Sequence, residues 1–351
     1  MKKIPVYFEA SCVDNGTLWV SSSDYNGLLR MDIKSGHVHY CGEFPDEDSL
    51  KQRLHYGNAL KVDNKIYFIP LESCHMHIYD ISKDVFESYY ISEQAAGYSF
   101  GTKWENYIYM VSTRKNNIAR FNLKTKKFEI VYENSKIILG YQHGIYVYNE
   151  KMYLMPYDSN SLLQFNIKEN TVQEWNIEGE GNTFQILGGK GSDIYIINKK
   201  SKYIFIWNIN LQEMIATGVY FKQEVNSWQN GKWIVGNNWN DNKVFIFEIN
   251  EKKVSSVCIK DYNSKTNQLL INSAFVYGDD ILFATNKGGD LYSVKDGSFK
   301  KSVFIDENDK KKKIIDCQRG KCELTKKILE EKETIDLETY IHLVTNTKSD
   351  K

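Results

Sequence analysis

Charge of one sign, long apolar runs and cysteine are all scarce in this chain of 351 residues. Basic and acidic residues balance at 45 each, whereas a nucleic-acid-binding protein usually carries a basic excess, so we expect no nucleic-acid partner. No run of about 18 apolar residues occurs, so we expect no membrane partner either. Two lysines open the chain without the apolar stretch that a signal peptide needs.

The 6 cysteines are spread over the whole chain. Such sparse use suits reduced thiols in the cytoplasm better than a disulfide framework, so we expect a cytoplasmic protein. Cys317 and Cys322 flank a short segment with a glycine, where a hairpin disulfide or half of a zinc site is the alternative to two free thiols.

A single strand-rich unit recurs seven times along the chain. Each copy has an aromatic strand, a polar loop and a second strand that ends in a turn. Alignment of the copies places seven anchors at one equivalent position: Trp19, Tyr67, Tyr109, Tyr153, Tyr195, Trp233 and Leu282. Their spacings of 48, 42, 44, 42, 38 and 49 residues fit four-stranded propeller blades. A β-sandwich does not usually repeat one unit in this way.

The sequence therefore predicts an all-β, seven-bladed β-propeller of four-stranded antiparallel blades over residues 1–306. Six or eight blades remain alternatives. The amino-terminal segment Lys3–Phe8 is expected either to extend the first inner strand or to pair with the last blade. Residues 307–321 form a charged, lysine-rich linker. Residues 322–351 are predicted to be a short C-terminal helical tail that packs on the outside of the propeller or docks a partner.

The repeat resembles the blades of the streptogramin B lyase group. The likeness lies in Trp19 with Leu29–Ile33, and in Tyr109 with the segment Asn116–Leu123. This resemblance implies the propeller fold from about residue 8 to residue 305. Lyases of that group use a late histidine and a glutamate, with magnesium, to open a cyclic ester by elimination. Here His143 is the last histidine before the tail, so the resemblance assigns no catalytic residue.

Function in a propeller is expected on the face that carries the longer loops. The connections between blades and the loops from second to third strand share that face, which also opens onto the central channel. Its aromatic and amide side chains suit a peptide, protein or glycan, so a binding or scaffold propeller is the first hypothesis. The expected ligand-binding residues are Tyr98, Tyr141, Gln142, Tyr157, Gln185, Asn226, Trp228, Asn237 and Trp239.

An enzyme with a site at the channel mouth is the alternative hypothesis. His55 and His143 enter inner strands, where either imidazole could act as the general base of a lyase or hydrolase. Glu72 is the third catalytic candidate, as a carboxylate that orients a histidine; Glu9, Tyr56 and Tyr141 are other possible partners. The competing interpretation is that both histidines simply bond to neighbouring backbone.

His75 and His77 are the metal-binding candidates. Alternate residues of a strand point to the same side, so the two imidazoles could bind one ion, with Glu72 or Cys74 as further ligands. A solvated strand edge explains the pair equally well. The sequence leaves open which cofactor, if any, is bound.

Overall fold

The regular structure of the described part of the chain consists of β-strands alone. The computed structural model describes residues 4–5, 8–23, 25–48, 51–134, 139, 145–156, 159–177, 183–220, 226–230, 233–237, 243–259, 271–277, 280–285, 290–293, 299–302 and 304–305. Among these residues, no helix is long and apolar enough to cross a membrane. The linker 307–321 and the tail 322–351, with Cys317 and Cys322, lie outside the described residues.

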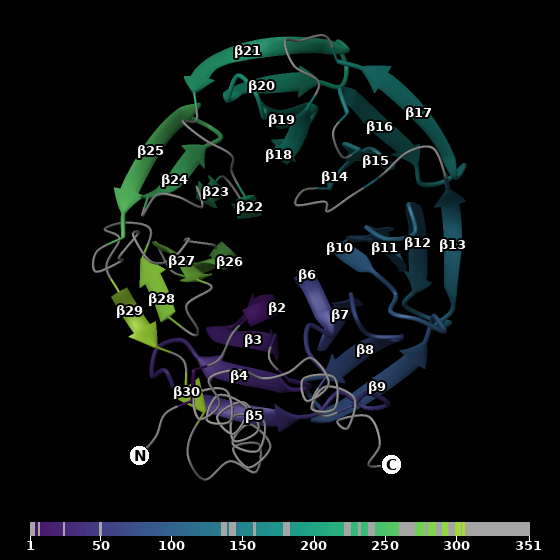
Figure 1. Ribbon diagram of the computed structural model, residues 1–351, viewed down its shortest axis with the longest axis vertical. Helices are drawn as coiled ribbons and strands as arrows, with labels where there is room; N and C mark the ends of the chain where they lie inside the picture. The colour runs from purple at the N-terminus through teal and green to yellow at the C-terminus, as the bar shows by residue number, and fades with distance from the viewer. Residues whose placement is uncertain are drawn as a thin grey trace, which may run out of the picture.

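Seven units of four antiparallel strands are arranged around a central axis (Figure 1). From inner to outer strand they are β2 (Phe8–Asp14), β3 (Thr17–Ser22), β4 (Leu28–Asp32) and β5 (Val38–Gly42); β6 (His55–Val62), β7 (Lys65–Pro70), β8 (His75–Asp80) and β9 (Val85–Tyr90); β10 (Tyr98–Trp104), β11 (Tyr107–Ser112), β12 (Asn117–Asn122) and β13 (Phe128–Glu133); β14 (Tyr146–Tyr148), β15 (Lys151–Leu154), β16 (Ser161–Asn166) and β17 (Thr171–Asn176); β18 (Phe184–Lys190), β19 (Asp193–Asn198), β20 (Tyr203–Asn208) and β21 (Glu213–Tyr220); β22 (Asn226–Asn230), β23 (Trp233–Asn237), β24 (Lys243–Glu248) and β25 (Lys253–Cys258); and β26 (Ile271–Tyr277), β27 (Asp280–Thr285), β28 (Asp290–Ser293) and β29 (Phe299–Ser302). One parallel pair between β2 and β6 joins the first two units into an eight-stranded sheet. The predicted propeller fold is confirmed.

The repeat alignment places the anchor correctly in six of the seven blades. In the sixth blade along the chain, it places the anchor two residues too early. In the first blade Thr17 pairs with Asp14 beside the turn, and the anchor Trp19 lies two residues further on. In the sixth blade Trp233 itself takes the pair beside the turn, with Asn230, so the equivalent anchor is the buried Val235. Residues two apart share a face of a strand, so the alternation could not tell Trp233 from Val235.

The turns from third to fourth strand repeat one hydrogen-bond pattern. In the first five blades an Asp or Asn ends the third strand, and its side-chain oxygen accepts from the backbone N–H two or three residues later, which closes the turn. These residues are Asp32, Asp80, Asn122, Asn166 and Asn208. Four residues further on, the chain has a positive φ at Gly36, Asp84, Lys126, Asn170 and Gln212.

The amino-terminal segment pairs with the short strand that follows the last blade, in a separate two-stranded sheet, rather than with the blade itself or as an extension of the first inner strand. β1 (Ile4–Pro5) forms an antiparallel pair with β30 (Phe304–Ile305), which follows β29. The ring is therefore closed by backbone pairing between its two ends.

The core lies mainly between neighbouring blades. Tyr67 and Ile69 of the second blade, for example, share one cluster with Ala119 and Phe121 of the third. The inner strands approach so closely that a Cβ on Gly57, whose φ is +71°, would lie 2.1 Å from the carbonyl oxygen of Ser99. Only glycine fits this position, because it has no Cβ.

Candidate functional site

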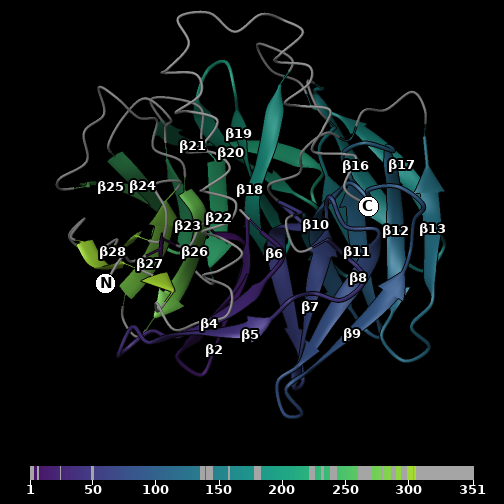
Figure 2. The same ribbon diagram turned by 60° about the horizontal axis from the view of Figure 1, so that its bottom comes forward.

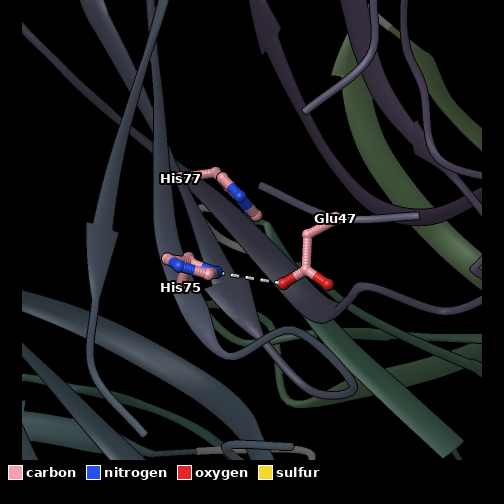
Figure 3. Close-up of side chains that lie close together, drawn as sticks. All are labelled: Glu47, His75 and His77. Carbon is pink, nitrogen blue, oxygen red and sulfur yellow. Dashed lines mark hydrogen bonds and ion pairs between the residues drawn. The ribbon is translucent and has the colours of Figure 1, made fainter. Parts of the chain in front are cut away.

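A cluster of polar side chains lies where the first and second blades meet, on the longer-loop face. It is built from the connection between β5 and β6 and from the residues that join β7 to β8, two connections expected to share this face. The strands β6 to β9 that support it lie side by side (Figure 2). Glu47, His75 and His77 converge at its centre (Figure 3).

Asn26 fixes the connecting segment that carries Glu47. This fully buried side chain donates from Nδ2 to the Phe44 carbonyl oxygen at 2.8 Å and accepts the Phe44 N–H at Oδ1 at 2.8 Å. Its Nδ2 also lies 3.2 Å from the carbonyl oxygen of Glu47. These bonds replace a strand pairing that the connection lacks, and so they hold the Pro45 carbonyl and the Glu47 side chain against the second blade.

The carboxylate of Glu47 is enclosed by hydrogen-bond donors. Its side chain is only 3% exposed. Oε1 accepts from Ser73 Oγ at 2.6 Å and from the Cys74 N–H at 3.0 Å. Oε2 accepts from Lys51 Nζ at 2.6 Å, and His75 Nδ1 lies 3.3 Å from Oε1. Burial raises the pKa of Glu47, but bonds from Lys51 and Ser73 outweigh it and lower the pKa below its usual value.

Four groups beside Glu47 form a continuous hydrogen-bond chain. Ser21 Oγ lies 2.8 Å from His55 Nδ1, His55 Nε2 lies 2.8 Å from His77 Nδ1, and His77 Nε2 lies 3.0 Å from the Pro45 carbonyl oxygen. The carbonyl can only accept, so His77 carries its proton on Nε2. His77 Nδ1 is then an acceptor, which places the His55 proton on Nε2. The hydroxyl of Ser21 donates to His55 Nδ1.

His55 and His77, the two histidines of this hydrogen-bond chain, are neutral at pH 7. His55 is fully buried, and burial together with the nearby His77 holds its pKa well below 6.5. Burial also lowers the pKa of His77 to about 4, although the Pro45 carbonyl favours its charged form. The Phe44 ring packs against both imidazoles, with centroids 4.4 Å from His55 and 5.2 Å from His77.

The catalytic candidates are placed in buried or paired positions. His55 bonds to Ser21 and His77 rather than to the expected Glu9, Glu72 or Tyr56, because its ring turns into the packing against Phe44 and Phe68. Glu72 forms an ion pair across two blades with Arg114, whose Nη1 donates to Oε2 at 3.1 Å and whose Nη2 donates to Oε1. His143 lies outside the described residues.

The expected ligand-binding residues are only partly described. Tyr98 is buried in the core, with its hydroxyl 3.2 Å from Asn117 Oδ1. Gln185 lies in β18, and its buried Nε2 makes no hydrogen bond within the described ranges. Asn226 and Trp228 lie in β22 and Asn237 in β23. Four others lie outside the described residues: Tyr141, Gln142, Tyr157 and Trp239. The set as a whole stays a prediction.

The metal candidates His75 and His77 lie next to each other, as strand alternation predicts, with ring centroids 5.9 Å apart. Glu47 completes a group of three with these histidines, and one ligand atom of each of the three residues lies within 4.8 Å of the others. Glu72 is instead paired with Arg114, and Cys74 contributes its backbone N–H. Glu47 is 28 residues from His75, and no sequence spacing points to it; its only signal is its place in the connection between blades.

Comparison with known proteins supports the fold. No family model matches the chain, and no curated protein matches it. Among solved structures, it is similar to a catalytically inactive variant of virginiamycin B lyase from Staphylococcus aureus with quinupristin, at TM-score 0.63 and 13% identity over 81% of this chain and 95% of that one. It is also similar to the extracellular domain of BT4673 from B. thetaiotaomicron, at 0.59 and 12% over 84% and 40%, and to a chain of the mitotic checkpoint complex, at 0.57 and 9% over 82% and 89%.

These similarities establish the class of protein. The chain is a β-propeller, with the architecture of streptogramin B lyases that the repeat suggested. Identities this low show the fold alone, and propellers with this fold carry unrelated functions. Function must therefore be argued from the residues of this chain.

Proposed function

We propose that this protein is a binding or scaffold propeller whose longer-loop face holds a peptide, protein or glycan. The observation that carries the proposal is the state of the catalytic candidates. His55 is fully buried with both ring nitrogens bonded, and Glu72 is paired with Arg114. A general base must reach a substrate proton, so these groups favour a structural role and leave the loops of this face for recognition.

Exposed polar side chains on the same face support this proposal. Arg114 and Lys115 lie in the connection between β11 and β12, where Lys115 Nζ reaches Ser92 Oγ at 2.8 Å. The guanidinium of Arg53 lies 5.6 Å from the centre of the Tyr56 ring. Arginine and tyrosine are enriched where proteins recognise partners, so the exposed side chains of Arg114 and Lys115 support a recognition role for this face.

The enzyme hypothesis has no comparable support in the described residues. It now rests on His143, which they do not include. The balanced charge of 45 basic and 45 acidic residues favours a partner other than nucleic acid. The cytoplasmic location and the class of the ligand belong to this proposal as predictions.

Charge reversal on the longer-loop face tests the proposal, with the same kind of charge reversal on the opposite face as the control. The full chain is labelled and applied to peptide and glycan arrays, and the affinity of each hit is measured by titration. We expect R114E with K115E to weaken binding at least about tenfold, which corresponds to a combined loss of about 1.4 kcal/mol from the two contacts.

The matched control is K124E with K127E, which reverses two exposed charges in the turn between β12 and β13 on the opposite face. This control should stay within about twofold of the original affinity, because exposed charges far from a ligand contribute little. Equal weakening by both pairs would contradict the proposal, as would a chain that binds no array member and no protein.

A further inference from the structure

We propose that Glu47, His75 and His77 bind a divalent transition-metal ion, with zinc as the best fit, and that the buried chain Ser21–His55–His77 orients the metal-binding imidazole. This site lies on the same longer-loop face as the ligand surface proposed above, but its metal binding does not rest on that function. Two histidines and one carboxylate are a donor set that zinc accepts, with a fourth position left for water or a ligand group.

The separations already approach those of a zinc site. The three ligand atoms lie within 4.8 Å of one another, and His75 Nδ1 and Glu47 Oε1 are 3.3 Å apart. Ligands of a tetrahedral zinc ion, at bonds of about 2.1 Å, lie about 3.4 Å from each other. The pair His75 and Glu47 thus needs almost no movement, and His77 needs a shift of at most about 1.4 Å to bring its ligand atom from 4.8 Å to about 3.4 Å of the others.

The carboxylate is held in place for such a role. Ser73 Oγ and the Cys74 N–H both donate to Oε1 of Glu47, and donors of this kind orient metal-binding carboxylates. Lys51 Nζ donates to the other carboxylate oxygen, Oε2, and so balances the negative charge of Glu47. Its side chain is 33% exposed, so it can turn to solvent when a metal replaces it as the cation.

His77 offers its lone pair through a tautomer change that the hydrogen-bond chain allows. Binding at Nε2 replaces the bond to the Pro45 carbonyl and moves the ring proton to Nδ1. His77 then donates to His55 Nε2, and His55 donates from Nδ1 to Ser21 Oγ. A hydroxyl accepts as readily as it donates, so the chain reverses with every proton retained.

This reversal gives His55 a function that its burial otherwise hides. A metal-binding histidine usually donates its second N–H to a fixed acceptor, which sets its tautomer and its orientation. His55 Nε2 is that acceptor in the metal-bound state. His55 is therefore a positioning residue that supports metal binding without touching the ion.

Titration of the full chain with Zn²⁺ and Co²⁺ after chelator treatment tests the proposal. We expect one equivalent of Zn²⁺ with an affinity on the order of 1 μM or tighter, and visible Co²⁺ absorption typical of a four-coordinate site. H75A and E47Q should each weaken binding at least about 100-fold, because H75A removes a ligand and E47Q replaces the anionic carboxylate with a neutral amide. H55Q should weaken it by about 10- to 100-fold while the Co²⁺ spectrum changes, because the orienting acceptor is altered.

A second histidine pair in the chain provides a matched control. His37 and His39 are also two residues apart, but both are exposed on and beside β5. The double variant H37A with H39A should retain the full equivalent of Zn²⁺. The proposal is overturned if the full chain binds no Zn²⁺ in this range, if binding survives in E47Q and H75A, or if it is lost in the control. E47Q preserves side-chain size, so circular dichroism should show native structure when binding is lost.

Discussion

At the scale of single residues, one backbone carbonyl sets the protonation of a buried histidine pair. The Pro45 oxygen can only accept, and this fixes the proton positions on His77, His55 and Ser21 in turn. Burial reinforces the arrangement, because it disfavours the charged form of each imidazole. The pair is thus neutral in the folded chain.

This neutrality predicts a stability that falls with acid in metal-free buffer. The folded pKa values of His55 and His77 lie below the ordinary 6.5, so the unfolded chain takes up protons first. Stability present above pH 6.5 is therefore lost as the pH falls toward about 4. As the pH falls from about 7.5 to 5.5, each of the two histidines should lower the free energy of unfolding by about 1.4 kcal/mol. Denaturant unfolding with a chelator present measures this loss.

The variant H77Q serves as the comparison for this measurement. Glutamine can donate to the Pro45 carbonyl without titrating, so about half of the loss should disappear. An identical drop in the variant and the original chain would contradict the assignment of this pH dependence to His77.

The contrast between His77 and Glu47 shows what the sequence can predict at this scale. The pairing of His75 with His77 follows from strand alternation, which needs only local sequence. The approach of Glu47 depends on how Asn26 holds a connection between two blades. Such a contact arises from tertiary packing of an irregular segment, and no periodicity encodes it.

At the scale of secondary-structure elements, the recurring turn from third to fourth strand carries a small strain. Gln212 takes a φ of +58° in the turn between β20 and β21. This left-handed conformation costs a non-glycine residue roughly 1–2 kcal/mol. The blade structure tolerates it because the Asn208 side chain closes the same turn.

Replacement of this residue by glycine is therefore expected to stabilise the protein. Glycine relieves the strain but gains freedom in the unfolded chain, so Q212G should add about 0.5–1 kcal/mol to the free energy of unfolding. The shift of the denaturation midpoint measures it. Q212A keeps the strain and should give no gain. A Q212G protein no more stable than Q212A would show that the turn holds no such strain.

The elements were predicted well because their turns have a chemical signature. The turn that ends each copy of the repeat marked the reversals, and aromatic residues marked the second strands. The side chains that close the turns from third to fourth strand were recognised only in the structure. The sixth anchor was misplaced because Trp233 and Val235 share one face and the larger residue drew the alignment. The position of the anchor depends on which residues of the first and second strands pair with each other, and the sequence does not show this pairing.

At the scale of the whole molecule, side chains on the inner strands join one blade to the next. Asn58 of β6 donates from Nδ2 to the Gly101 carbonyl at 2.7 Å and accepts the Gly101 N–H at Oδ1 at 3.0 Å. It thus completes the hydrogen bonding of β10 as a strand would. The same residue pairs through its backbone with Ser11 of β2, so three blades meet at this position.

Loss of this amide should weaken the whole ring. N58A leaves the N–H and the carbonyl of Gly101 without partners, which should cost about 2–3 kcal/mol in the free energy of unfolding. The control N176A removes an exposed amide from β17 and should stay within about 0.5 kcal/mol. A loss in N58A no larger than in the control would show that water replaces these bonds without cost.

The pairing of Ile4 with Ile305 has a consequence for the order of the blades. It brings the first and last strands of the ring to a single seam, so the contacts between blades run around a closed circle. A circle has no intrinsic first member. If the chain were joined across this seam and reopened in a tight turn of another blade, the permuted sequence would specify the same set of neighbours. The linear order of the seven units is therefore one of several equivalent ways to write the same ring.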